Sequence, residues 1–265
     1  LLYDLAPIRG GISPLFFNFK IMKNKKELKA VCFGEVLWDV FPSHKKIGGA
    51  PLNVALRMKA LGVDSNIISR VGSDEDGAEI LSYINNQNVN SDSIQVGEDY
   101  KTGVVNVMIN EKGNASYDIL YPSSWDKITL TKEMIEKVSE SDVFIFGSLI
   151  CRDEISRSTL YALLDKAKYK VFDANLRAPY YTTEVLLELM SKADFIKLND
   201  EELWEISRKL ESPYNSFEQN IKFIAEKTNT KQVCVTKGAF GAVLYCNDKF
   251  YYNSGYFIKV VDTVG

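Results

Sequence analysis

The 265-residue sequence contains one histidine, His44, and four widely separated cysteines. A single histidine cannot build a multi-histidine metal site, and a Ser-His-Asp triad would have to use His44 itself. No two cysteines form a Cys-x-x-Cys pair, and most lie inside apolar runs, as Cys234 does between two valines. This usage favours buried, reduced thiols in a cytoplasmic protein. Any chemistry must therefore rest on carboxylates, amides, lysine, arginine and backbone groups.

Long apolar runs and an excess of positive charge are also missing. The longest mostly apolar run, Val143 to Cys151, is interrupted by glycine and serine and is far shorter than the roughly 20 residues that cross a bilayer. Lys and Arg number 32 against 35 Asp and Glu, a net charge of −3, which disfavours binding to nucleic acid. We expect a soluble protein with no membrane and no nucleic-acid partner.

The first 21 residues show no helical or strand period, whereas Met22 followed by four polar residues is typical of a natural start. A secretory signal would need a basic segment before a continuous apolar stretch, and residues 1–21 have neither. We predict that residues 1–21 are a non-native or upstream extension and that the folded domain occupies residues 22–265.

From Ala30 onward, short β-branched and aromatic runs alternate with amphipathic segments, which predicts an α/β fold with a mainly parallel sheet. The predicted strands are Ala30 to Phe33, Asn66 to Arg70, Val143 to Phe146, Lys170 to Asp173, Phe195 to Leu198 and Gln232 to Thr236. The predicted helices are Pro51 to Leu61, Gly77 to Gln87, Lys132 to Ser139, Glu154 to Lys168, Thr183 to Lys192, Asp200 to Leu210 and Phe217 to Thr228.

One segment interrupts this alternation. Thr102 to Ile109 and Ala115 to Tyr121 flank a turn-rich bridge, which predicts an antiparallel hairpin. Inserted into a parallel layout, such a hairpin is a candidate lid over a ligand. Val105 and Val107 would share one face of it, because side chains alternate along a strand.

Candidate ligand-binding residues lie between the first predicted strand and just inside the first predicted helix. Gly48 and Gly49 come just before a helix that carries Asn53. The two glycines could let the backbone approach a ligand closely, or they could form only a turn before a helix that starts with proline. Asp39 falls near the carboxyl end of the sheet, where α/β proteins usually bind ligands, although a solvated surface aspartate fits equally well.

Later strand ends carry further polar groups. Asp173, Asn175 and Arg177 follow a strand directly, and a carboxylate, an amide and a guanidinium together favour function over a plain loop. Asn199 and Glu202 repeat the arrangement, but a helix cap explains them equally well. The segment Thr236 to Gly241 has glycine spacing suited to a nucleotide and matches neither a Walker A loop nor a dinucleotide fingerprint.

Taken in order, these motifs resemble those of the ribokinase-like (PfkB) sugar kinases, and most of all bacterial fructokinases. The matching segments are Gly34-Glu35-x-Leu37-x-Asp39, Gly48-Gly49-Ala50-Pro51-x-Asn53, Arg70 to Gly77, Asp173-x-Asn175-x-Arg177, Asn199-x-x-Glu202, Thr236-x-Gly238-x-x-Gly241 and Asp262-Thr263-x-Gly265. The resemblance runs from about Ala30 to Gly265. It implies a three-layer α/β/α fold with a small β-strand lid near residues 38–48 and 100–122.

The resemblance also assigns roles. It implies that ATP and Mg²⁺ are the cofactors, with K⁺ as a further candidate, and that a homodimer could form through the lid. The implied sugar-binding residues are Asp39, Gly48, Gly49, Asn53, Val105, Val107, Ser148 and Asn175, with Arg177 near the transferred phosphate. Asn199, Thr236, Gly238 and Gly241 would border the nucleotide, Glu202 would act through magnesium and its waters, and Asp262 and Thr263 would belong to a monovalent-cation loop.

Within that family, a Gly-Ala-Gly-Asp motif supplies the anion hole and the general base. Gly265 would be its first residue, which places the base three positions beyond the end of this sequence. We therefore expect an ATP-dependent fructokinase that is incomplete at its C-terminus, and no turnover by these 265 residues. The alternatives are a kinase for 2-keto-3-deoxygluconate, ribose or a nucleoside, or a non-catalytic sugar-binding or oligomerisation module.

Overall fold

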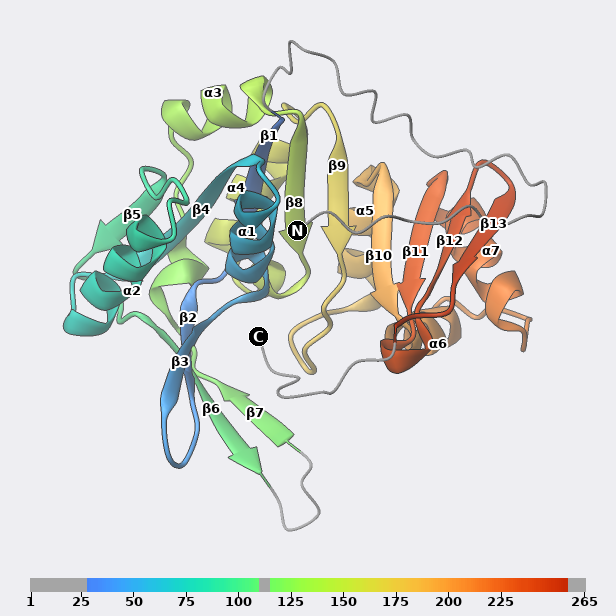
Figure 1. Cartoon of the computed structure of the whole chain (residues 1–265), viewed down its shortest axis with the longest axis horizontal. Helices are drawn as coiled ribbons and strands as arrows, with labels where there is room; N and C mark the ends of the chain where they lie inside the picture. The colour runs from blue at the N-terminus through green and yellow to red at the C-terminus, as the bar shows by residue number, and fades with distance from the viewer. Residues whose placement is uncertain (1–27, 110–114, 257–265) are drawn as a thin grey trace, which may run out of the picture.

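The computed structural model describes residues 28–109 and 115–256 and contains a nine-stranded sheet with helices on both faces (Figure 1). Its spatial order is β13-β12-β11-β10-β9-β8-β1-β4-β5. The strands are β1 (Lys29–Phe33), β4 (Asp64–Gly72), β5 (Ile94–Gly97), β8 (Val143–Gly147), β9 (Lys170–Asp173), β10 (Phe195–Asn199), β11 (Gln232–Thr236), β12 (Ala242–Cys246) and β13 (Lys249–Asn253). All pairs from β5 to β11 are parallel, so the predicted fold class is confirmed.

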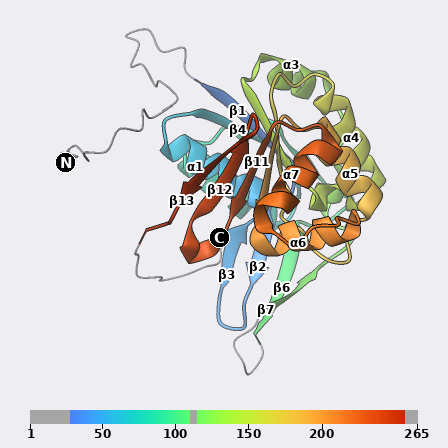
Figure 2. The same cartoon turned by 90° about the vertical axis from the view of Figure 1, so that its right-hand side faces the viewer.

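The helices form two layers, one on each side of this sheet (Figure 2). One layer holds α1 (Ala50–Ala60) and α2 (Glu75–Asn86). The other holds α3 (Lys132–Glu140), α4 (Glu154–Leu164), α5 (Thr183–Lys192), α6 (Asp200–Lys209) and α7 (Phe217–Thr228). Side chains cap the starts of two of these helices: the Thr131 hydroxyl accepts a hydrogen bond from the Met134 amide, and the Asn199 side chain accepts one from the Glu202 amide, as the cap interpretation of Asn199 predicts.

The hydrophobic core is divided between the two faces of the sheet. Strand β1 shows why: Cys32 packs into the cluster beneath α1 and α2, whereas its neighbours Val31 and Phe33 pack into the larger cluster beneath the other helices. Alternation along a strand sends successive side chains to opposite faces, so a strand covered on both faces must be apolar throughout. The continuous apolar runs in the sequence have this origin.

A second, four-stranded sheet projects beyond the carboxyl ends of the large one (Figure 1). This small sheet consists of β2 (Leu37–Val40), β3 (Lys45–Gly48), β6 (Gly103–Ile109) and β7 (Ala115–Ile119), in the order β3-β2-β6-β7. The pairing of β6 with β7 is antiparallel and sets Val105 opposite Ile119, which confirms the predicted hairpin. Its turn lies outside the described residues.

The sequence prediction misses three strands of the large sheet, β5, β12 and β13. The hairpin β12–β13 does carry a signal, because its two turn residues are Asn247 and Asp248, both with positive φ. Asparagine and aspartate tolerate the left-handed conformation that a two-residue hairpin turn requires. Within the described residues, no helix is long and apolar enough to cross a membrane.

Candidate active site

A cavity of about 460 Å³ lies between the small sheet and the carboxyl ends of β1, β8, β9 and β10. The loops after these strands place polar groups on its floor, and the small sheet contributes apolar groups. The lining residues are Glu35, Leu37, Asp39, Gly49, Ala50, Asn53, Val54, Val105, Tyr117, Ile119, Leu149, Asp173, Asn175, Arg177 and Lys197. The cavity thus has a polar floor and an apolar wall, which suits a ligand with many hydroxyls on a carbon skeleton.

The start of α1 reaches the cavity through two glycines. Gly49 is the N-cap of α1 with φ of +113°, and a Cβ there would lie 2.3 Å from the carbonyl oxygen of Glu35. A Cβ on Gly48 would lie 2.1 Å from Oδ2 of Asp39. Only glycine permits this approach, so Gly48 lets the backbone pass close to the Asp39 carboxylate, and Gly49 lets the start of α1 pass close to the Glu35 carbonyl.

Three carboxyl groups and two cations face the cavity. Lys197 Nζ pairs with Asp173 Oδ1 at 3.0 Å, and the Arg177 guanidinium lies 5.7 Å from the centre of the Tyr117 ring. Burial raises the pKa of the Asp39 carboxyl, while Arg177 and Lys46 oppose that increase. The floor therefore offers charged acceptors and donors in a setting from which much water is excluded.

Glu35 is the most perturbed of these groups. Its side chain is 4% exposed, and one oxygen accepts the Ala50 amide at 3.3 Å. Burial raises the pKa of the Glu35 carboxyl to about 7; its own amide, Arg177 and the Ala50 amide lower it, and Asp173 raises it further. A carboxyl that changes its charge near neutral pH in a cavity can serve as donor or acceptor for a ligand hydroxyl.

This shift predicts a pH-dependent stability. Because the folded pKa lies above the ordinary value of 4.5, the protonated form is favoured by folding. The contribution of Glu35 to stability is therefore greatest below pH 4.5 and is lost as pH rises through about 7, by up to about 3 kcal/mol. Denaturant unfolding at pH 5 and pH 8 should show a larger loss for the unmodified protein than for Glu35→Gln. An equal loss in both proteins would contradict the prediction.

The structure gathers most of the residues predicted to bind the sugar. Five of the eight line the cavity: Asp39, Gly49, Asn53, Val105 and Asn175. Arg177, predicted near the transferred phosphate, lines it too. The other three lie outside the lining formed by the described residues. Gly48 sits behind Asp39. Ser148 is 1% exposed and donates its hydroxyl to the Ala174 carbonyl at 2.6 Å, and Val107 is buried in the core. Ile119 and Leu37 take part in the apolar wall that was predicted from Val105 and Val107.

The residues predicted to border a nucleotide lie at the neighbouring strand ends. Asn199 and Thr236 are aligned across the parallel pair β10–β11. Glu202 is 6% exposed; its Oε2 accepts the Asn199 amide at 2.8 Å and its Oε1 accepts the Leu176 amide at 2.9 Å. The cap interpretation of Glu202 thus holds geometrically, and the same carboxylate ties α6 to the loop that carries Arg177.

The glycines of the following turn differ in their surroundings. Gly238 has φ of +52°, and no described atom lies within 4 Å of where its Cβ would be, whereas a Cβ on Gly241 would collide with the Asn253 carbonyl. Open main chain at Gly238 leaves room for a ligand to approach. The predicted residues Asp262, Thr263 and Gly265 lie outside the described residues.

Sequence reasoning misses Glu35, Lys197 and Tyr117 as cavity residues. Glu35 lies in the same Gly-Glu-x-Leu-x-Asp segment as Asp39, so its position after a strand was an available signal. Lys197 lies inside β10 and Tyr117 inside β7, and neither has a local pattern that marks it. Their role depends on which strands are neighbours.

A large parallel sheet covered by two helix layers, with a small sheet walling a polar cavity at its carboxyl edge, is the architecture of ribokinase-like sugar kinases. The chain belongs to the pfkB family of carbohydrate kinases, whose family model matches residues 21–265.

Known relatives agree with this assignment. "Probable fructokinase-6, chloroplastic" from Arabidopsis thaliana is 28% identical over 257 residues, covering 89% of this chain and 66% of the plant protein, just under two thirds. Fructokinase from Escherichia coli is 27% identical over 227 residues, covering 82% of this chain and 72% of the bacterial protein.

Solved structures share the fold. A sugar kinase from Pyrococcus horikoshii in complex with ATP superposes with a TM-score of 0.76 at 26% identity, covering 89% of this chain and 80% of that one. A Vibrio cholerae fructokinase variant with bound fructose, ADP and potassium superposes with a TM-score of 0.75 at 22% identity, covering 89% and 78%.

Proposed function

We propose that the protein is an ATP-dependent sugar kinase that transfers the γ-phosphate of ATP to a hydroxyl of fructose. The observation that carries this proposal is the cavity itself, in which Asp39, Asn53 and Arg177 face an apolar wall at the carboxyl edge of the sheet. Family membership and the fructokinase relatives support the same substrate class.

The charge of the cavity favours a neutral sugar over a sugar acid. The described lining contains three carboxyl groups against two cations, and one of these cations, Lys197, is already paired with Asp173. A carboxylate substrate would have to enter beside Asp39 and Glu35, and like charges in a partly buried site repel. This argues against 2-keto-3-deoxygluconate, the nearest alternative.

The lining residues can divide the work of phosphoryl transfer. Asp39 can accept hydrogen bonds from sugar hydroxyls, and the Asn53 amide can both accept and donate them. Together they fix which hydroxyl points at the nucleotide. Val105 and Ile119 cover the carbon skeleton and exclude water. Arg177, which carries a permanent charge, can stabilise the negative charge on the transferred group.

The strand ends beside the cavity suit a nucleotide. The main chain at Gly238 is open to an approaching ligand, and Asn199 and Thr236 add polar side chains at the ends of β10 and β11. An ATP–Mg²⁺ complex would supply the phosphoryl group and a divalent charge to neutralise it. Both Glu202 oxygens already accept backbone amides, so Glu202 fits contact with the waters of Mg²⁺ better than direct ligation. We also propose that Asp262 and Thr263 contribute to a site for K⁺.

A substrate panel tests this function on the complete gene product. We expect ADP formation with ATP, Mg²⁺ and fructose, and a kcat/KM for fructose above those for ribose, a nucleoside and 2-keto-3-deoxygluconate. Better turnover of 2-keto-3-deoxygluconate would overturn the fructose assignment. Calorimetry that detects fructose but no nucleotide would instead favour the sugar-binding module. Light scattering of the same sample tests the proposed homodimer through the small sheet.

A further inference from the structure

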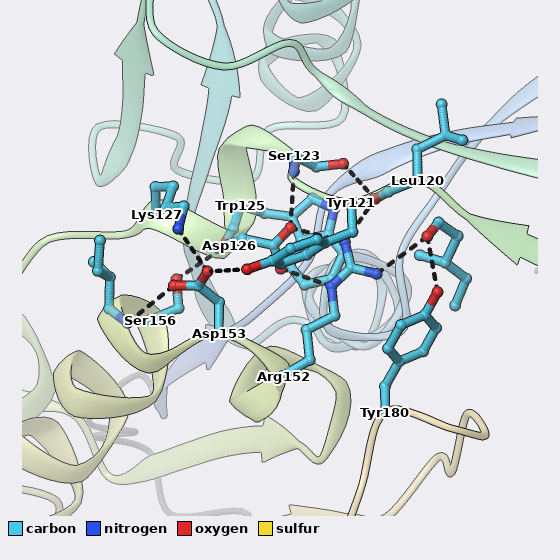
Figure 3. A network of polar contacts seen from close by, with 12 residues as sticks. Leu120, Tyr121, Ser123, Trp125, Asp126, Lys127, Arg152, Asp153, Ser156 and Tyr180 are labelled. Carbon is cyan, nitrogen blue, oxygen red and sulfur yellow. Dashed lines mark hydrogen bonds and ion pairs between the residues drawn. The ribbon is translucent and has the colours of Figure 1, made fainter.

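A buried arginine lies beside the sugar cavity and contributes nothing to its lining. Arg152 ends a short 3-10 turn after β8 (Leu149–Arg152), and its side chain is 2% exposed. Its guanidinium forms a two-point ion pair with Asp126, which is 0% exposed: Nε lies 2.7 Å from Oδ1, and the second nitrogen, Nη2, lies 2.8 Å from Oδ2 (Figure 3). Burying this pair costs desolvation, so its position calls for an explanation beyond stability.

Aromatic rings fix the plane of the same guanidinium. Its central carbon lies 4.0 Å from the centre of the Trp125 ring, 4.9 Å from that of Tyr180 and 5.2 Å from that of Tyr121. Figure 3 shows the guanidinium held among these side chains. Carboxylate and rings together hold Arg152 in one orientation, and its remaining N–H groups therefore point in fixed directions.

Those N–H groups point at the end of β7. One donates to the Leu120 carbonyl at 2.7 Å and another to the Ile119 carbonyl at 3.3 Å. The Tyr180 hydroxyl donates to the same Ile119 carbonyl at 3.1 Å. Ile119 is the last residue of β7, and its side chain lines the cavity opposite Val105.

Tyr180 also belongs to the loop that carries Arg177. The Tyr180 amide donates to the Arg177 carbonyl at 2.9 Å and closes a tight turn between them. Arg177 in turn lies over the ring of Tyr117, the other cavity residue of β7. One loop thus contacts β7 at Tyr117 through Arg177 and at Ile119 through Tyr180.

We propose that Arg152 and Tyr180 are positioning residues of the sugar site: they fix the Ile119 carbonyl and thereby hold β7, which carries the wall residue Ile119, in place against the loop that carries Arg177. This inference rests on the proposed sugar-kinase function. Neither residue touches substrate. Their effect is on the distance between the wall and the polar floor, and therefore on sugar affinity more than on nucleotide affinity.

The adjacent half of the network provides a matched control. Tyr121 donates its hydroxyl to Asp153 Oδ2 at 2.9 Å, and Lys127 pairs with the same oxygen at 2.6 Å. Tyr121→Phe and Tyr180→Phe each delete one hydroxyl and keep the ring beside Arg152. Only Tyr180→Phe removes a hydrogen bond to a residue of the cavity wall.

In the complete gene product we expect Tyr180→Phe to raise the KM for fructose about three- to ten-fold with the KM for ATP unchanged, and Tyr121→Phe to leave both unchanged. Arg152→Lys keeps the charge opposite Asp126 but loses the planar fork, so we expect a larger increase in the fructose KM than with Tyr180→Phe. An unchanged fructose KM in Tyr180→Phe, or equal increases in both tyrosine variants, would overturn the proposal.

Hydrogen exchange separates this inference from the proposed function, because it needs no ligand. Amides of residues 117–120 should exchange faster in Tyr180→Phe than in Tyr121→Phe. If the unmodified enzyme phosphorylates no sugar while this difference is present, the function fails and the positioning of β7 stands. If the exchange rates are equal, the positioning fails whatever the substrate.

Discussion

Replacing Asp39 with alanine is expected to weaken fructose binding by about 100-fold to 1,000-fold, the loss of two hydrogen bonds to a charged acceptor. Asp39 lines the cavity from β2, and its carboxylate lies against the backbone of Gly48. Titration calorimetry with fructose on the complete gene product measures the effect directly.

The stability of the variant distinguishes lost binding from lost folding. Burial raises the pKa of Asp39, so its charged form is held at some cost to the fold, and Asp39→Ala should unfold at the same denaturant concentration as the unmodified protein or at a higher one. Asp118→Ala is the matched control, because Asp118 is an exposed carboxylate of the same small sheet, outside the described cavity lining. Equal losses of affinity in both variants would contradict a sugar-binding role for Asp39.

The second large effect is expected for Gly49→Ala, which should lower the free energy of unfolding by about 2–4 kcal/mol. Two costs add at this residue. An L side chain is strained at φ of +113°, and its Cβ would meet the Glu35 carbonyl at 2.3 Å, a backbone atom that cannot rotate away. Urea unfolding followed by tryptophan fluorescence reports the change, because Trp125 and Trp38 are buried in the folded protein.

Gly62→Ala separates these two costs. Gly62 also has a positive φ, +82°, but no described atom lies within 4 Å of its Cβ position. It should therefore show only the conformational part, about 1 kcal/mol. If Gly49→Ala were no more destabilising than Gly62→Ala, the close approach of α1 to Glu35 would be unimportant for stability.

Much of the fold could be predicted because its signals are local. The helices from Lys132 and Thr183 begin as predicted, since Thr131 and Thr182 cap them within four residues of sequence. The six apolar runs predicted as strands are all in the parallel part of the sheet, where both faces are buried. The edge strand β13 was missed because most of its residues are exposed and its pattern is weak.

The same distinction between local and long-range signals applies to the residues of the site. Asp39, Asn53 and Arg177 were accessible to sequence reasoning because each lies in a short motif after a strand or at the start of a helix, and the carboxyl ends of parallel strands share one edge. Lys197 and Tyr117 were not, because no neighbour in sequence indicates which cavity a strand residue faces. Arg152 is the clearest case: its partners Asp126 and Leu120 are 26 and 32 residues away.

The order of the motifs, and the alternation of apolar runs with amphipathic segments, are enough to place this α/β chain among carbohydrate kinases. Only the packing of the folded chain sets which groups share the cavity, places Ser148 and Val107 behind its lining, and raises the pKa of Glu35 to about 7. The reason is physical. Caps, turns and strand alternation are fixed within a few residues, whereas burial, pKa and the hold of Arg152 on β7 arise only when segments distant in the chain pack together.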